Sequence, residues 1–142
     1  MDNLGVARIF TNIGDLLEIK GANPFKIRAY RNAADIVGHM AEPIADLGDA
    51  EVRALPGIGK DLTAKIRELI DTAALAYYDE LRQEFPPTIL EMLRLQGVGP
   101  KTVAVLYGEL GIETLDDLET AATEGRLRTL KGMGPKKELL LL

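Results

Sequence analysis

Three short segments that combine glycine and lysine are the first candidates for a binding site in this chain. Each has two glycines around one aliphatic residue, with a lysine one or two positions later: Gly57, Gly59 and Lys60; Gly97, Gly99 and Lys101; Gly132, Gly134 and Lys136. Glycine adopts the positive φ of a sharp turn and leaves no side chain between backbone and ligand. A helix beginning after such a turn has unpaired N–H groups at the positive end of its dipole. The spacing therefore predicts three anion sites that suit phosphate.

Two other interpretations of these glycines are disfavoured by the neighbouring residues. A dinucleotide-binding turn needs a strand before it and a third glycine after it, and neither is found at any copy. A nucleotide-triphosphate loop needs Ser or Thr after Gly-Lys, whereas Asp61 follows Lys60. The remaining alternative is that each Gly-x-Gly only joins two packed helices. One copy leaves that alternative open, and three copies make it the weaker interpretation.

A basic segment before the first glycine pair is the second candidate for binding. Lys26 and Tyr30 are four residues apart and therefore share one face of a helix, with Arg31 beside them. A phosphate could meet a cation and a phenol together on this face. The alternative is a solvated basic face with a half-buried tyrosine.

Short amphipathic helices are expected to carry these candidate residues. Gly21 is a natural helix stop, and Asn23-Pro24 supplies an N-cap followed by proline at the first helical position. Apolar residues at helical spacing predict helices over residues 4–20, 24–37, 42–47, 49–55, 60–72, 75–85, 89–95, 100–110, 114–124 and 135–142. No useful β-type alternation occurs, so the predicted fold is all-α. Pro86-Pro87 predicts a boundary between two small helical lobes, 1–85 and 86–142.

Composition limits the classes of function. The 142 residues are 46% hydrophobic and contain no cysteine, which predicts a packed core without disulfides or thiolate metal sites. The net charge of −5, from 17 basic and 22 acidic residues, is unfavourable for a broad positive field. A nucleic-acid binder of this composition would need a narrow basic strip. No run reaches the length of a membrane span, so we expect no membrane partner and a cytoplasmic location.

The glycine pattern resembles the helix-hairpin-helix motif, which in the families that carry it holds one DNA strand by its phosphates without reading bases. The order of segments is similar to the N-terminal part of bacterial or archaeal family X DNA polymerases over essentially the whole chain. The resemblance is carried by residues 23–31, 55–66, 95–101 and 110–118. It implies that the first lobe holds the 5′-phosphate side of a DNA gap and that the second grips the duplex.

The resemblance also implies roles for individual positions. Lys26, Tyr30 and Lys60 would lie at the 5′-phosphate pocket, and the hairpin amides would meet backbone phosphates. A K⁺ or Na⁺ ion would sit on hairpin carbonyls, those of Arg53, Leu55 and Ile58 and those of Leu93, Leu95 and Val98. Mg²⁺ would belong only to the polymerase domains of a longer parent protein, which would be a nucleoid-associated repair polymerase acting on gapped or nicked DNA, for example in base excision repair.

Lys65 matches the lysine that attacks an abasic sugar through a Schiff base in the lyase-active members of that family. Such chemistry needs a neutral amine, whereas Asp61 and Glu68 can share its helix face and favour the charged form. An ordinary helical ion pair is the alternative. A second alternative function is a non-catalytic scaffold that binds protein. The four leucines 139–142 are expected to mark the cut end of a longer protein, or else a natural end covered by a partner.

Overall fold

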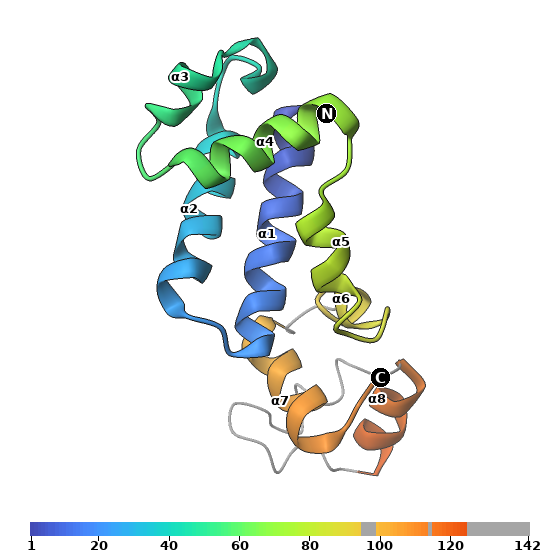
Figure 1. The fold of residues 1–142 in the computed structure, drawn as a ribbon. Helices are drawn as coiled ribbons and strands as arrows, with labels where there is room; N and C mark the ends of the chain where they lie inside the picture. The colour runs from blue at the N-terminus through green and yellow to red at the C-terminus, as the bar shows by residue number, and fades with distance from the viewer. Residues whose placement is uncertain (95–98, 114, 125–142) are drawn as a thin grey trace. The chain divides into compact units, whose positions relative to one another are not determined.

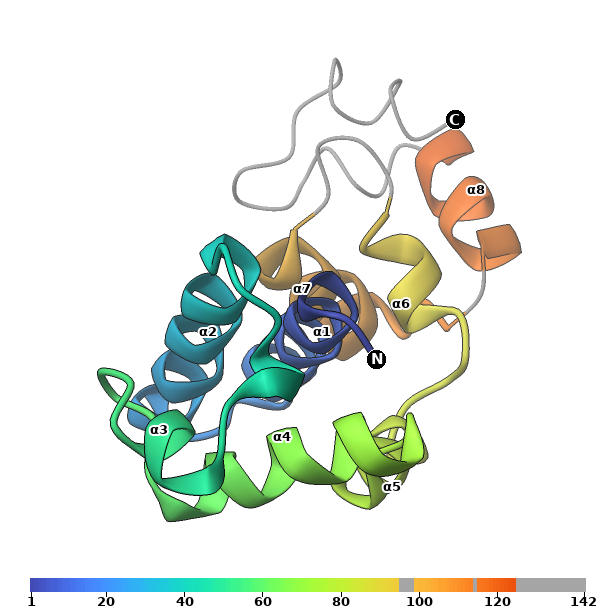
Figure 2. The ribbon, with the colours of Figure 1, turned by 90° about the horizontal axis from the view of Figure 1, so that it is seen from above.

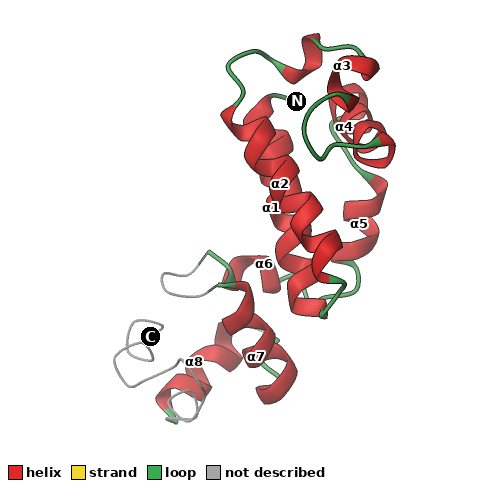
Figure 3. Ribbon diagram, turned by 90° about the vertical axis from the view of Figure 1, so that its left-hand side faces the viewer, coloured by secondary structure: helices red, strands yellow, loops and turns green. Residues whose placement is uncertain are grey.

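The computed structural model describes residues 1–94, 99–113 and 115–124, and its regular elements are helices (Figures 1 and 3). In chain order these elements are α1 (Asn3–Lys20), α2 (Pro24–His39), the 3-10 helix η1 (Ile44–Asp46), α3 (Asp49–Arg53), α4 (Lys60–Thr72), α5 (Ala76–Arg82), α6 (Ile89–Met92), α7 (Pro100–Leu110) and α8 (Leu115–Thr123). No strand occurs within the described ranges, and the all-α prediction is confirmed.

The chain forms two compact units. Unit 1 comprises residues 1–17 and 21–81, and unit 2 comprises residues 18–20 and 82–142. Unit 1 holds nearly all of α1 to α5, and unit 2 holds α6 to α8. The predicted domain limits, 1–85 and 86–142, stay a prediction, because compactness alone does not show that a segment folds by itself.

The turn between α1 and α2 follows from local sequence. Gly21 has a φ of +78°, a conformation that glycine adopts without strain and that ends α1. The Asn23 side chain then accepts the N–H of Phe25 at 2.8 Å and caps α2, while Pro24 occupies the first helical position. The capping residues predicted for this turn are therefore confirmed.

Helices α1 and α2 run antiparallel, side by side, in unit 1 (Figures 1 and 2). Their buried contact includes Phe10 and Tyr30, whose rings meet edge to face at a centroid distance of 5.6 Å. At its margin an Arg31 guanidinium nitrogen lies 2.9 Å from an Asp15 carboxylate oxygen. The large, fully buried side chains of unit 1 are those of Phe10, Ile13, Leu16, Leu17, Ile44, Ile66, Leu69 and Leu75. This core fixes the helices that carry the candidate site.

Unit 2 is built from three short helices and their connections. Helix α7 begins after Gly99 and ends at Gly111, whose φ is +66°. The Thr88 hydroxyl donates to the Glu113 carbonyl, and the Glu113 N–H donates to Asp117 at 3.2 Å. Its large, fully buried side chains are those of Ile89, Met92, Leu106 and Ile112. Most of the second hairpin turn (95–98) and all of the third hairpin (131–136) lie outside the described residues.

Several expected helices are shorter or of another type in the structure, namely those over 42–47, 49–55, 75–85 and 89–95. Residues 42–47 form only the 3-10 helix η1, because Leu47 is already extended, with φ −88° and ψ 142°. The helix expected over 75–85 is the shorter α5. It starts after Ala73, which adopts a left-handed conformation with a φ of 58° and ends α4. Helix α4 itself has the predicted limits.

Candidate nucleic-acid interface

The first hairpin joins α3 to α4 through residues 54–59. Gly57 has a φ of +77°, as a sharp turn requires. Ile58 is 2% exposed and anchors the turn in the core, and its N–H donates to the Leu55 carbonyl at 3.1 Å. Gly57 and Gly59 on either side of it are exposed. The hairpin therefore buries its aliphatic residue and turns its glycine backbone toward solvent.

The N-terminus of α4 is presented by this turn. Gly59 is the N-cap residue and has no side chain with which to bond the first amides of the helix. Its carbonyl accepts the Thr63 N–H at 3.0 Å and the Thr63 hydroxyl at 2.7 Å. Lys60, the first helical residue, is exposed. Amides at the positive end of the helix dipole and one lysine thus form a local anion-attracting surface.

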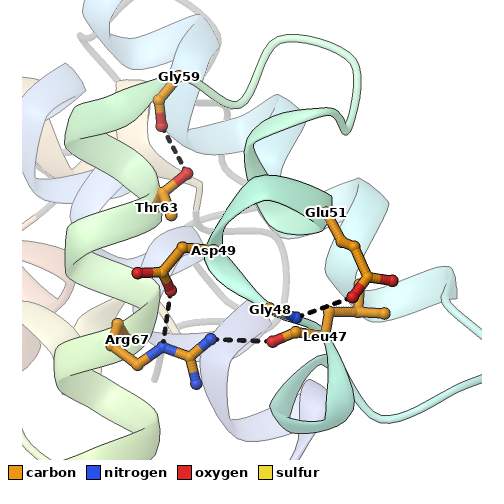
Figure 4. Close-up of polar contacts among 7 residues, drawn as sticks. All are labelled: Leu47, Gly48, Asp49, Glu51, Gly59, Thr63 and Arg67. Carbon is orange, nitrogen blue, oxygen red and sulfur yellow. Dashed lines mark hydrogen bonds and ion pairs between the residues drawn. The ribbon is translucent and has the colours of Figure 1, made fainter.

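Polar contacts brace α3 against α4 (Figure 4). Arg67 donates from Nε to an Asp49 carboxylate oxygen at 3.1 Å and from Nη2 to the Leu47 carbonyl at 2.9 Å. The Gly48 N–H donates to Glu51 at 3.1 Å, which is the carboxylate half of a capping box. These contacts hold both helices that flank the turn.

Asn32 on α2 ties the same turn to the rest of unit 1. Its side-chain nitrogen donates to the Pro56 carbonyl at 3.1 Å. A Cβ added to Gly57 would come within 2.5 Å of that nitrogen. Sequence reasoning missed Asn32, since an exposed helical asparagine carries no signal that it will meet a turn far along the chain.

Tyr77 on α5 is a second residue that sequence reasoning missed. The Nζ atoms of Lys26 and Lys65 each lie 5.0 Å from the centroid of its ring. The ring is nearly parallel to that of Tyr30, with a 4° interplanar angle and centroids 5.9 Å apart. The structure therefore brings together Lys26 of α2 and Lys65 of α4, which no spacing rule along the chain connects. The attraction of each ammonium to the ring is a cation–π interaction.

Tyr30 lies in the core of unit 1 and is 3% exposed. Burial raises the pKa of its phenol well above the ordinary value, and the nearby Tyr77 and Asp61 raise that pKa further. The phenol is therefore neutral at physiological pH. Tyr30 is thus more deeply buried than the half-buried tyrosine of the alternative interpretation, and a phosphate contact by Tyr30 stays a prediction.

Lys65 forms the ion pair that was the alternative to lyase chemistry. Its Nζ donates to both carboxylate oxygens of Asp61, at 2.8 and 2.9 Å. Glu68, the other acid expected near Lys65, accepts the N–H of Ala76 at 2.7 Å and caps α5. The Lys65 amine is therefore engaged in an ordinary ion pair between residues four apart on one helix.

The second hairpin is described only at its end. Gly99 is extended, with φ −112° and ψ −179°, and caps α7, in which Pro100 is the first residue and Lys101 is exposed. Most of the other predicted contacts of the second and third hairpins lie outside the described residues: Gly97, Leu95, Val98, Gly132, Gly134 and Lys136. Leu93, whose carbonyl was also expected to bind the cation, is described and is the C-cap of α6. The roles of all these residues stay predictions.

The first hairpin contains three of the carbonyls expected to bind a monovalent cation, those of Arg53, Leu55 and Ile58. The Leu55 carbonyl accepts one hydrogen bond, from Ile58, which leaves a second lone pair for a cation. Within the part of the chain that the structure describes, no group of His, Cys, Asp or Glu is arranged to hold a metal. None of the helices described has both the length and the apolar character needed to cross a bilayer.

Comparison with known proteins identifies the family. Residues 1–75 match the model of the helix-hairpin-helix domain, which is more than half of the chain. The chain belongs to the helix-hairpin-helix domain family. Residues 89–142 match a second model, the SAM-like helix-hairpin-helix tandem. The helix-hairpin-helix assignments thus cover both the first hairpin and the segment that contains the second and third.

This helix-hairpin-helix chain is also similar to the DNA polymerase/3'-5' exonuclease PolX of Bacillus subtilis (strain 168). The two are 32% identical over 142 residues, which is 100% of this chain and 25% of the relative. The chain therefore spans about a quarter of the length of this curated relative. The similarity to family X polymerases inferred from the sequence is confirmed. Together, the family matches and this similarity relate the chain to a part of a family X polymerase.

Proposed function

We propose that this chain binds gapped or nicked duplex DNA without sequence preference, through backbone phosphates and a 5′-phosphate, as part of a family X repair polymerase. The observation that carries the proposal is the exposed Gly57–Gly59 turn leading into the N-terminus of α4. Backbone amides at such a terminus bind phosphate oxygens and position DNA, but they carry no base information. The helix-hairpin-helix matches support the same role for the second and third hairpins.

Local charge makes this compatible with an acidic chain. Lys26 and Lys65 meet at Tyr77, and Lys60 opens α4, all within unit 1. Lys60 beside the uncapped amides of α4, with Lys26 and Lys65 in the same unit, would supply local positive charge even though the net charge is −5. Since the Debye length is about 10 Å at 0.1 M salt, the remote acidic residues are largely screened there.

The proposal is tested with two gapped duplexes that differ only in having a 5′-phosphate or a 5′-hydroxyl at the gap. We expect tighter binding of the phosphorylated duplex, and affinity that falls steeply between about 50 and 200 mM salt. Equal affinities for the two duplexes at every salt concentration would overturn the 5′-phosphate part of the proposal.

A monovalent cation belongs to this proposal. K⁺ or Na⁺ on the carbonyls of Arg53, Leu55 and Ile58 would face the bound phosphate and offset its charge. Replacing both ions with tetramethylammonium at constant ionic strength should then weaken binding. Unchanged affinity would remove the cation from the proposal.

A protein-binding scaffold is the second candidate, and the acidic net charge favours it. A stable oligomer by native mass spectrometry, together with no DNA binding at low salt, would support the scaffold. Lyase chemistry at Lys65 is a separate hypothesis. The contacts of Lys65 with Asp61 are unfavourable for lyase chemistry, because the amine must leave this ion pair before it can form a Schiff base.

A further inference from the structure

Two ammonium groups from different helices converge on the ring of Tyr77. Lys26 extends from α2 and Lys65 from α4, and each Nζ lies 5.0 Å from the ring centroid. The two nitrogens therefore cannot be further apart than twice that distance. Like charges repel, so this convergence needs a group that attracts both, and the π face of a tyrosine does so.

The ring of Tyr77 is itself held by the core of unit 1. It lies parallel to the ring of Tyr30, which is buried and meets Phe10 edge to face. Tyr77 is only partly buried, so the ring links the packed interior to the surface. The side chain of Lys65 is 17% exposed, whereas Lys26 is an exposed residue. The aromatic stack thus gives fixed positions to side chains that are flexible when free in solvent.

We propose that Tyr77 is a positioning residue that holds the ammonium groups of Lys26 and Lys65 ready to bind one phosphate monoester, the 5′-phosphate of a gap. This inference rests on the proposed function and deepens it. A monoester carries a charge of about −1.5 to −2 at pH 7 and three acceptor oxygens. A diester within the strand carries one charge. Two ammonium groups therefore match the monoester better than a diester or a hydroxyl.

Asp61 is an acidic group that contacts one member of this pair, Lys65. Its two carboxylate oxygens accept from Lys65 at 2.8 and 2.9 Å. Two ammonium groups and one carboxylate leave a net positive charge for the incoming phosphate. Lysine has three N–H donors in its ammonium group, so Lys65 can keep Asp61 and still donate to a phosphate oxygen.

The test compares Tyr77→Phe with Tyr77→Leu, using the whole chain and the gapped duplexes with a 5′-phosphate or a 5′-hydroxyl. Phenylalanine keeps the π face, so the preference of Tyr77→Phe for the phosphorylated duplex should stay within about twofold of wild type. Leucine removes the face, and Tyr77→Leu should lose roughly threefold to tenfold of that preference. Its affinity for the hydroxyl duplex should change little. A full phosphate preference in Tyr77→Leu would overturn the inference.

A second measurement needs no variant that could misfold. The ring current of Tyr77 should move the ε-methylene proton signals of Lys26 and Lys65 upfield in the NMR spectrum. On titration with a 5′-phosphorylated oligonucleotide, both signals should shift together and saturate at one concentration. Movement of one lysine alone would overturn the inference. No preference of the wild-type chain for the phosphorylated duplex would instead defeat the proposed function itself, so the two failures are distinguishable.

Discussion

Asp61, in the first turn of α4, accepts hydrogen bonds from the Lys65 ammonium with both carboxylate oxygens, at 2.8 and 2.9 Å. The Asp61 side chain is 79% exposed and that of Lys65 only 17%. The acid therefore stands on the solvent side of the lysine, where a phosphate would approach. An acid in the first turn is favoured by the helix dipole, and under the proposed function it would compete with DNA phosphates for the same positive groups.

Replacing Asp61 with asparagine should strengthen binding of phosphorylated gapped DNA. The substitution keeps the shape of the side chain and removes the repulsion between carboxylate and phosphate. We expect a gain of about threefold to tenfold at roughly 50 mM salt. The matched control is Asp71→Asn, the same charge change at an exposed position near the other end of α4. Equal gains from both variants would show that only the net charge matters.

Lyase chemistry should be weak in the wild-type chain. Borohydride traps a Schiff base on abasic DNA only if the amine is free to attack the sugar, and both carboxylate oxygens of Asp61 engage the amine of Lys65. We expect little cross-linked product from wild type, more from Asp61→Asn and none from Lys65→Ala. A cross-link that persists in Lys65→Ala removes this residue from the role. Efficient cross-linking by wild type would show that the ion pair does not prevent attack by this amine.

The two glycines of the first hairpin should respond differently to alanine. Gly57 has a φ of +77°, and an added Cβ would lie 2.5 Å from the Asn32 side-chain nitrogen. Gly57→Ala should therefore lower the free energy of unfolding by about 1–3 kcal/mol. Gly59 has a φ of −96° and no atom within 4 Å of an added Cβ. Gly59→Ala should cost at most about 1 kcal/mol, because glycine is the better N-cap.

The Gly59→Ala variant should also differ from wild type in its affinity for DNA. The methyl group of Gly59→Ala stands beside the first amides of α4, so we expect weaker binding to DNA from a folded protein. Urea denaturation measures the stability, and titration of gapped duplex measures the affinity. Unchanged affinity in Gly59→Ala, with the fold intact, would argue against amide contacts at this turn.

The buried phenol of Tyr30 predicts a pH dependence of stability. Because burial raises its pKa in the folded state, the native protein keeps a proton that the unfolded chain loses near pH 10. Stability from this group is thus fully present below about pH 10 and is lost as pH rises toward the higher folded pKa. The slope reaches at most about 1.4 kcal/mol per pH unit. Urea denaturation at pH 9 to 11 should show a steeper fall for wild type than for Tyr30→Phe. Parallel curves would contradict the burial effect.

Local signals in the sequence predict the position of each described helix, although not every limit. The cap at Asn23, the stop at Gly21 and the limits of α4 all depend on neighbouring residues, which a sequence displays directly. The ion pair of Lys65 was an expected alternative for the same reason, since residues four apart share a helix face. The glycine turn at Gly57 also has the predicted positive φ.

Contacts between distant elements were not predictable. Tyr77, Asn32 and Arg67 each reach a partner on another helix or turn, and no spacing rule connects them to it. The burial of Tyr30 was not predictable from helix spacing either. Its spacing from Lys26 suggested a shared exposed face, but α1 and α5 bring Phe10 and Tyr77 against its ring. Tertiary packing, rather than helix periodicity, decided which side chains are exposed.

We propose that the hairpins hold DNA by its phosphates, and the salt dependence of wild-type binding to gapped duplex is the measurement that decides this. The logarithm of the association constant should fall linearly with the logarithm of salt concentration, with a slope of about −0.9 for each phosphate contacted. We predict a slope corresponding to several phosphates. A slope near zero, or no binding at about 50 mM salt, would contradict the claim.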